Sequence, residues 1–151
     1  MIYDPIGPSL PRLAGDYATT ITIAYQNSLD TRADTLFAVI TLPNVGRRGN
    51  FMGQYVIGTE VGPFGGLLFP SRRIELPTFG PGPQPIAQVA SVRALYPQCD
   101  FSRVGTGQLL GELRGDTLLV TGQASLPCTS ESDPAAVDLT TSLRLDFFGV
   151  R

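Results

Sequence analysis

Apolar and polar residues alternate along most of the chain, with the period of a β-strand that buries one face. The alternation is clearest over residues 15–26 and 137–147, where apolar side chains occupy one face and mostly polar ones the other. β-branched residues crowd the first of these runs, which favours a strand over a helix. No segment shows a convincing helical period. The pattern therefore predicts an all-β protein.

Turn residues divide the rest of the chain into further short strands. We predict these at residues 35–42, 51–59, 67–69, 72–76, 87–96, 108–113 and 117–126. The strand at 35–42 is apolar on both faces, so we expect it to be covered on both sides. Eight or nine strands without an internal repeat predict a mainly antiparallel small barrel, with a β-sandwich as the alternative.

Proline marks the two irregular parts of the sequence. Residues 1–12 contain three prolines and are expected to form an extended arm, followed by one domain over residues 13–151. Residues 78–86 are expected to form a long loop. The start of the chain has neither a basic nor an apolar signal region. We expect that Met1 stands where an export signal has been replaced.

Composition removes several classes of chemistry. The 151 residues include no histidine, and all eleven basic residues are arginines. A Ser-His-Asp or Cys-His nucleophile, an imidazole metal ligand and a lysine Schiff base are therefore excluded within this chain. A GC-rich genome, whose codons favour arginine, accounts for the missing lysine. The net charge of −2, with no basic run longer than two residues, argues against a nucleic-acid partner.

The length of the apolar runs and the two cysteines bear on where the protein is located. No apolar run approaches the 18–20 residues of a membrane-spanning helix, although a membrane tether stays open. Cys99 and Cys128 each follow a predicted strand, and a disulfide between them would stabilise the fold by roughly 3–4 kcal/mol. Two separate buried thiols are the alternative. The bond is the stronger expectation, because both cysteines follow strand ends in a chain that we expect to be exported. We expect the protein to lie outside the cytoplasm, in the periplasm or at the cell surface.

Three motifs were weighed as sites of chemistry. Residues 105–111 have the spacing G-x-G-x-x-x-G, but a strand follows instead of the helix that would hold a pyrophosphate. The acidic residues near Arg32 and those after Cys128 lack the spacing of a calcium loop. No pair of carboxylates is placed as a glycosidase requires. We therefore predict no catalytic residue, no metal and no cofactor.

Aromatic and apolar residues offer two binding candidates. If a barrel is hollow, Tyr17, Tyr25, Phe51 and Tyr55 are candidates to line a ligand cavity, although they could equally fill the core. Residues 61–69 are expected to form an apolar hairpin tip that either contacts a partner or packs onto the barrel mouth. The interaction candidates within this tip are Phe64, Leu67, Leu68 and Phe69.

The segment Leu13-Ala14-Gly15-Asp16-Tyr17 resembles the Gly-x-Trp start of the first strand in lipocalin-like (calycin) barrels, with Tyr17 in place of tryptophan. The Pro-rich arm and Arg144 in the last strand fit the same outline, while the family's other short motifs are absent. The chain is also similar in texture to small exported β-rich lipoproteins of GC-rich bacteria. The barrel resemblance implies a small apolar ligand and no enzyme activity.

Three functions follow as expectations. The first is a non-catalytic accessory subunit that docks on a larger envelope or membrane-associated assembly through a protein partner. The second is a lipocalin-like carrier of a small apolar ligand. The third is a barrel-type cyclase without histidine, so enzyme activity stays undecided, with the balance against it.

Overall fold

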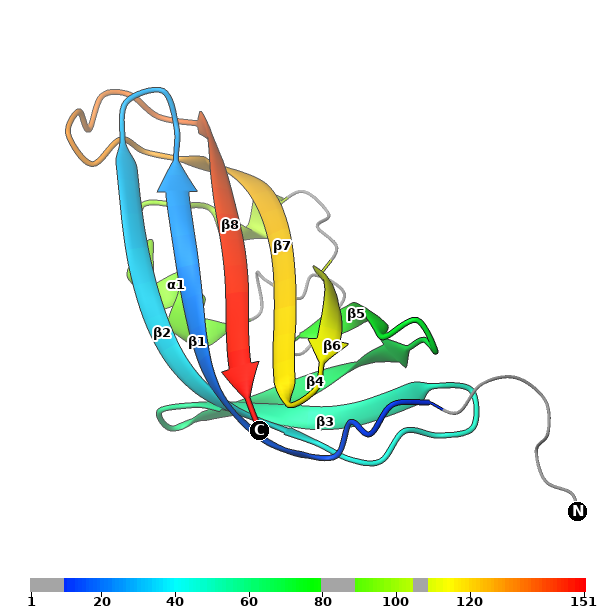
Figure 1. Cartoon of the computed structure of the whole chain (residues 1–151). Coiled ribbons are helices and arrows are strands. Elements are labelled where there is room, and N and C mark those ends of the chain that lie inside the picture. Colours follow the sequence, from blue (N-terminus) through cyan, green and yellow to red (C-terminus); the bar gives the residue numbers. More distant parts are fainter. Residues whose placement is uncertain (1–9, 80–88, 105–108) are drawn as a thin grey trace, which may run out of the picture.

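The protein is a closed antiparallel barrel of eight strands in sequence order, each strand paired with its neighbours in the chain and β1 with β8 (Figure 1). The structure, a computed structural model, describes residues 10–79, 89–104 and 109–151. The prediction of an all-β barrel is confirmed. The strands are β1 (Gly15–Gln26), β2 (Thr31–Leu42), β3 (Asn50–Ile57), β4 (Glu60–Leu68), β5 (Arg73–Phe79), β6 (Leu109–Arg114), β7 (Thr117–Cys128) and β8 (Leu139–Val150).

Short turns join most of the strands, as the turn residues of the sequence predicted. The side chain of Asn27 accepts hydrogen bonds from the backbone N–H groups of Leu29 and Asp30, which closes the β1–β2 turn at 2.9 and 2.8 Å. Gly115 has a φ of 59° in the β6–β7 turn, a conformation that costs glycine little. These local signals hold the meander in register.

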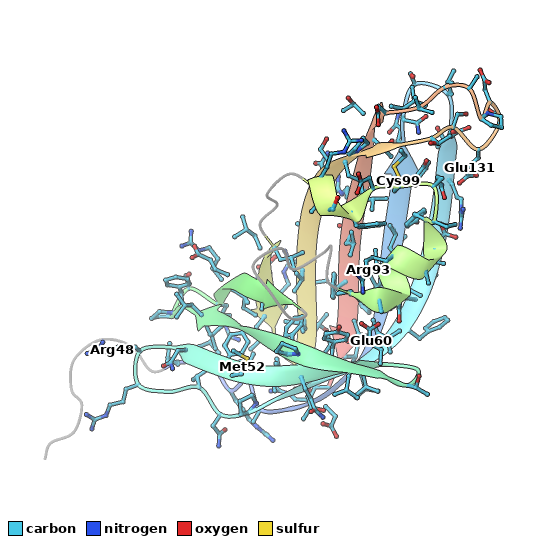
Figure 2. The ribbon with its side chains drawn as sticks, turned by 180° about the vertical axis from the view of Figure 1, so that it is seen from behind. Arg48, Met52, Glu60, Arg93, Cys99 and Glu131 are labelled. Carbon is cyan, nitrogen blue, oxygen red and sulfur yellow. A yellow bond between two sulfur atoms is a disulfide. The ribbon has the colours of Figure 1, made fainter. Side chains whose placement is uncertain are left out.

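One half of the barrel is closed by a helix in place of strands. β2 pairs with β3 only over Val39–Thr41, so the part of β2 nearer the β1–β2 turn has no β3 partner. The short helix α1 (Ala90–Leu95) covers the inner side of β1 and β2 there (Figure 2). The ring of Tyr96 stacks on Tyr25 with centroids 5.0 Å apart. The barrel interior at this end is therefore filled from the β5–β6 connection.

A disulfide fastens this connection to the barrel. Cys99 and Cys128 are bonded, as predicted, and the backbone on either side pairs through Asp100 N–H to Pro127 O and Thr129 N–H to Gln98 O. The bond joins the segment after α1 to the end of β7. It thus holds the segment that fills the barrel.

The opposite end of the barrel is closed by the last residue. The guanidinium of Arg151 lies 5.5 Å from the ring centroid of Tyr17 and donates to the carbonyl oxygens of Arg12 and Ala14 at 2.9 and 3.2 Å. Arg144, the arginine expected to fit the barrel outline, instead points outward from β8 with its side chain 3.2 Å from a neighbouring carboxylate. Arg151, directly after β8, is therefore the arginine that meets Tyr17.

Two predicted elements are wrong. Residues 87–96, predicted as a strand, contain α1, whose six residues are too few to show a helical period. Residues 61–69, predicted as a hairpin tip, lie almost entirely within β4, which pairs with β3 on one side and β5 on the other. The glycines here do not make a turn: a Cβ on Gly66 would lie 2.0 Å from the carbonyl oxygen of Glu75, so glycine permits close strand contact.

Smaller differences concern boundaries and residues outside the description. β2 begins at Thr31, four residues earlier than predicted, and eight strands form where eight or nine were expected. Three predicted features lie wholly or partly outside the described residues. They are residues 1–9 of the Pro-rich arm predicted at 1–12, most of the loop predicted at 78–86, and the glycines at 105 and 107. In the part of the chain that the structure describes, no helix has the length and apolar character needed to span a membrane.

Candidate functional site

The four aromatic residues considered for a ligand cavity all point into the barrel. Tyr17, Tyr25 and Tyr55 are completely buried, and Phe51 is 5% exposed. The hydroxyl of Tyr17 donates to the carbonyl oxygen of Leu13 at 2.7 Å, which satisfies a polar group in an apolar interior. All four side chains belong to the apolar core of the barrel.

Buried hydroxyls in the interior are held neutral. Burial raises the pKa of Tyr55, and its 2.9 Å hydrogen bond to Glu60 raises that pKa further. Burial also raises the pKa of Tyr96. The carboxylate of Asp34, which accepts a hydrogen bond from the Tyr96 hydroxyl at 2.7 Å, raises that pKa further. Both phenols are therefore hydrogen-bond donors and not bases at neutral pH.

Glu60 joins two parts of the barrel that the sequence did not connect. It accepts hydrogen bonds from the backbone N–H of Ala90 at 2.7 Å, and from the N–H and hydroxyl of Ser91 at 2.8 and 2.6 Å. Burial raises the pKa of this carboxyl, but the hydrogen bonds from Ser91 and Ala90 outweigh it and leave the pKa lowered. The carboxylate is a structural anchor for the start of α1.

The acidic residues weighed for calcium meet an arginine instead. Arg32 lies 2.8 Å from Asp34 and 3.0 Å from Glu131, so the two acidic loops come together through a cation on β2. The carboxylate of Asp30 accepts the backbone N–H of Glu131 at 3.0 Å, which lowers the Asp30 pKa. No group of acidic, histidine or cysteine side chains among the described residues is arranged to hold a metal ion.

The predicted interaction residues, three in β4 and Phe69 directly after it, differ in exposure. Phe64 and Leu68 are buried in the core, whereas Leu67 is exposed and Phe69 is partly exposed. The guanidinium of Arg73 covers the ring of Phe69 at 4.6 Å. Because β4 is a paired strand and not a protruding tip, these four residues do not form one continuous apolar surface.

A larger apolar surface lies on the outside of the barrel, on the side of β2, β1, β8 and β7 that faces away from α1, and it reaches Val56 on β3 (Figure 1). Two rows of cross-strand neighbours run across these strands and contain no charged residue. We call them the outer apolar band. The first row is Phe37, Thr20, Phe148 and Leu119, and the second is Val56, Val39, Ala18 and Val150.

Several band side chains are unusually exposed for apolar residues. Phe37 is 72% exposed, Phe148 56%, Val39 45% and Val150 43%. A single exposed apolar residue requires no explanation, but a contiguous group on one sheet face is typical of an interaction surface. The band is therefore the candidate functional site.

Two hollows open on this band. The first, the β6–β8 hollow, has a volume of about 640 Å³. It is bounded by outward-facing residues of β1, β8, β7 and β6: Thr20, Thr22, Phe148, Leu119, Thr121 and Leu110. The second, of about 470 Å³, lies on the other side of β1 and is bounded by Phe37, Val39, Ala18 and Val56. Both hollows include Thr20 and so form one surface.

The charged residues of the β6–β8 hollow are each paired within the chain. Arg73 lies 2.8 Å from Glu75, Glu112 lies 2.6 Å from Arg114, and Asp146 lies 3.2 Å from an arginine of β8. These pairs are solvent-exposed and weak, but they leave the hollow without net charge. Its floor offers apolar side chains and threonine hydroxyls.

The sequence carried one signal for this surface. Residues 35–42 are apolar on both faces, and we expected the strand to be covered on both sides. The structure buries one face and leaves Phe37 and Val39 exposed on the other. Phe148 and Val150 lie beyond the end of the last predicted strand, so their part in the surface was missed.

Comparison with known proteins gives no family for the chain. No protein-family model matches it, and no curated protein matches it either. The closed eight-stranded antiparallel barrel is compatible with the lipocalin-like resemblance at the level of architecture.

Proposed function

We propose that this protein is a non-catalytic interaction module that binds a protein partner through the outer apolar band. The observation that carries the proposal is the exposure of Phe37, Val39 and Phe148 in two neighbouring rows of one sheet face that contain no charged residue. Burying such a surface against a partner removes apolar area from water, at about 25 cal/mol per Å². The partner would be part of a larger envelope-associated assembly, for which this chain is an accessory subunit.

The interior supports an interaction module over a carrier. Phe64 and Phe147 meet with ring centroids 6.3 Å apart, and Tyr25 stacks on Tyr96 at the other end of the barrel. The interior aromatic side chains thus contact one another and the backbone. A carrier requires that such side chains line a space that its ligand fills.

The disulfide supports a location outside the cytoplasm, where such bonds form and persist. The absence of histidine and lysine from the sequence supports binding without catalysis, since the commonest general base and the amine nucleophile are missing. A cyclase that only folds an apolar substrate would still require an enclosed space.

The proposal is tested by capture with matched variants. The folded protein, immobilised through its amino terminus, is incubated with an envelope extract of the cells that produce it, and retained proteins are identified by mass spectrometry. We expect Phe148→Glu to abolish retention of the partner and Leu29→Glu to leave it unchanged, because Leu29 lies in the β1–β2 turn away from the band. Equal retention by both variants would contradict the proposal.

A second measurement distinguishes a carrier from an interaction module. The protein purified from its own cells is unfolded and extracted with organic solvent, and the extract is analysed by mass spectrometry. A stoichiometric apolar compound, with no partner lost in Phe148→Glu, would favour the carrier over the interaction module.

A further inference from the structure

We infer that a second copy of this chain occupies the outer apolar band, giving a symmetric dimer in which Phe37 of each copy enters the β6–β8 hollow of the other. The inference rests on the proposed function, in that the band is the binding surface, and it assigns the band to a second copy of this chain in place of a different envelope protein. It follows from the shape of the band, its lack of charge and its size.

The band carries a projection and a hollow side by side. Phe37, on β2, is 72% exposed and is the most exposed of the large apolar side chains. The β6–β8 hollow begins on β1, where Thr20 is the cross-strand neighbour of Phe37, and extends across β8 and β7, with Phe148 and Leu119 in its lining. At about 4.8 Å between strands, Phe37 lies roughly 14 Å from the line of β7, along which the hollow is centred.

A two-fold axis relates these features. In an isologous dimer each surface element meets its counterpart across the axis, so a projection and a hollow must lie on opposite sides of it. The midpoint between Phe37 and β7 falls between Thr20 and Phe148, which are themselves neighbours across β1 and β8. An axis through this point places both aromatic rings in hollows at once.

The charges of the chain permit this contact. The two central rows of the band have no charged residue, and the charged residues at the hollow are paired within the chain. The net charge of −2 gives only weak repulsion between copies. A strongly basic or acidic partner would find no complementary field on this face.

The size of the face sets the expected affinity. Five neighbouring strands of about six residues each cover a face of roughly 24 by 20 Å, or about 500 Å² per copy. Two such faces together bury about 1,000 Å², the lower limit for specific interfaces. We therefore expect a reversible dimer with a dissociation constant on the order of micromolar or weaker.

Complementation between two variants tests the geometry. Phe37→Ala removes the projection, and Leu119→Trp fills the hollow, so each variant alone should be monomeric. A mixture of the two should recover dimers, because the intact Phe37 of one variant meets the intact hollow of the other. In the second contact of that mixed dimer, the alanine at position 37 of one variant faces the hollow that the tryptophan at position 119 of the other variant fills.

The assay is sedimentation velocity of the full chain from about 1 to 500 µM, with circular dichroism to confirm that each variant folds. The wild type should shift from 16.1 kDa towards twice that mass, and Leu29→Glu should behave in the same way. A wild type that stays monomeric at 500 µM overturns the dimer. So does a mixture that stays monomeric although both variants are folded.

A cross-link locates the axis without relying on the tryptophan variant. Because packed sheets lie about 10 Å apart, a Thr20→Cys thiol near the axis should join its counterpart through a short bis-maleimide. Cys99 and Cys128 are bonded to each other and do not compete. Leu29→Cys should give no such product. Equal cross-linking of both variants would overturn the proposed axis.

The two proposals fail in different ways. A monomeric chain that loses another captured protein in Phe148→Glu would refute the dimer and leave the proposed function standing. A monomeric chain whose captured proteins are the same for the wild type and Phe148→Glu would refute both.

Discussion

Glu60 offers the sharpest test of how the barrel is held closed. Its carboxylate accepts four hydrogen bonds, three from Ala90 and Ser91 and one from Tyr55, at distances from 2.6 to 2.9 Å. These bonds join the start of β4 to the start of α1. We therefore expect Glu60→Ala to loosen the α1 segment from the barrel and to destabilise the whole fold.

The magnitude follows from the four contacts. A hydrogen bond to a charged group contributes about 1.5–3 kcal/mol, but bonds that share one acceptor are not additive, and water replaces part of this partly exposed side chain. We expect a loss of about 2–4 kcal/mol in the free energy of unfolding. For a chain of this length that corresponds to a fall of roughly 5–15 °C in Tm.

The measurement is urea unfolding at pH 7, followed by far-ultraviolet circular dichroism and by tyrosine fluorescence, since the chain has no tryptophan. Glu112→Ala is the matched control, because that carboxylate is paired with an exposed arginine at 2.6 Å and should contribute less than about 1 kcal/mol. A loss below about 0.5 kcal/mol for Glu60→Ala, or equal losses for the two variants, would refute the anchoring role.

The pH dependence of Glu60 has a definite sign. Its pKa in the folded protein is lowered, so the unfolded chain binds the proton more tightly. The stabilisation is complete above the ordinary glutamate value of about 4.3 and is lost as the pH falls through the lower folded value. The stability gap between wild type and Glu60→Ala should therefore narrow on acidification from about pH 5 to pH 3. A widening gap would contradict this reasoning.

Two further predictions concern the ends of the barrel. Replacing Cys99 and Cys128 by alanine should lower the free energy of unfolding by roughly 3.5 kcal/mol, because the bond spans 29 residues; a double variant as stable as the oxidised wild type in urea would contradict it. Arg151→Ala should cost about 2–3 kcal/mol in the same assay, since the arginine side chain is only 15% exposed and its guanidinium covers Tyr17. Asp116→Asn removes only the 70% exposed partner of this arginine and should cost less than about 1 kcal/mol; equal losses for the two would place the stabilisation in the ion pair.

Alternation and turn residues predicted those strands in which apolar and polar positions alternate without interruption. β1 was predicted with its bounds, because residues 15–26 alternate strictly and lie between the Pro-rich arm and a turn. The hairpin of β6 and β7 was found from Arg114, Gly115 and Asp116 for the same reason. The segments that were mistaken, β4 and α1, take their structure from distant contacts: β4 from glycines that allow close strand contact, and α1 from the carboxylate of Glu60.

The sequence by itself determined the all-β character of the chain, the inward side of β1 and β8, the pairing of the two cysteines as an expectation, and the absence of histidine chemistry. Only the tertiary structure decided which apolar face stays open to solvent. The alternation pattern predicts which residues share a face of a strand. Whether another layer covers the second face depends on elements far along the chain. Here nothing in the described residues covers Phe37 or Phe148, and their exposure directs the functional proposal to the outside of the barrel.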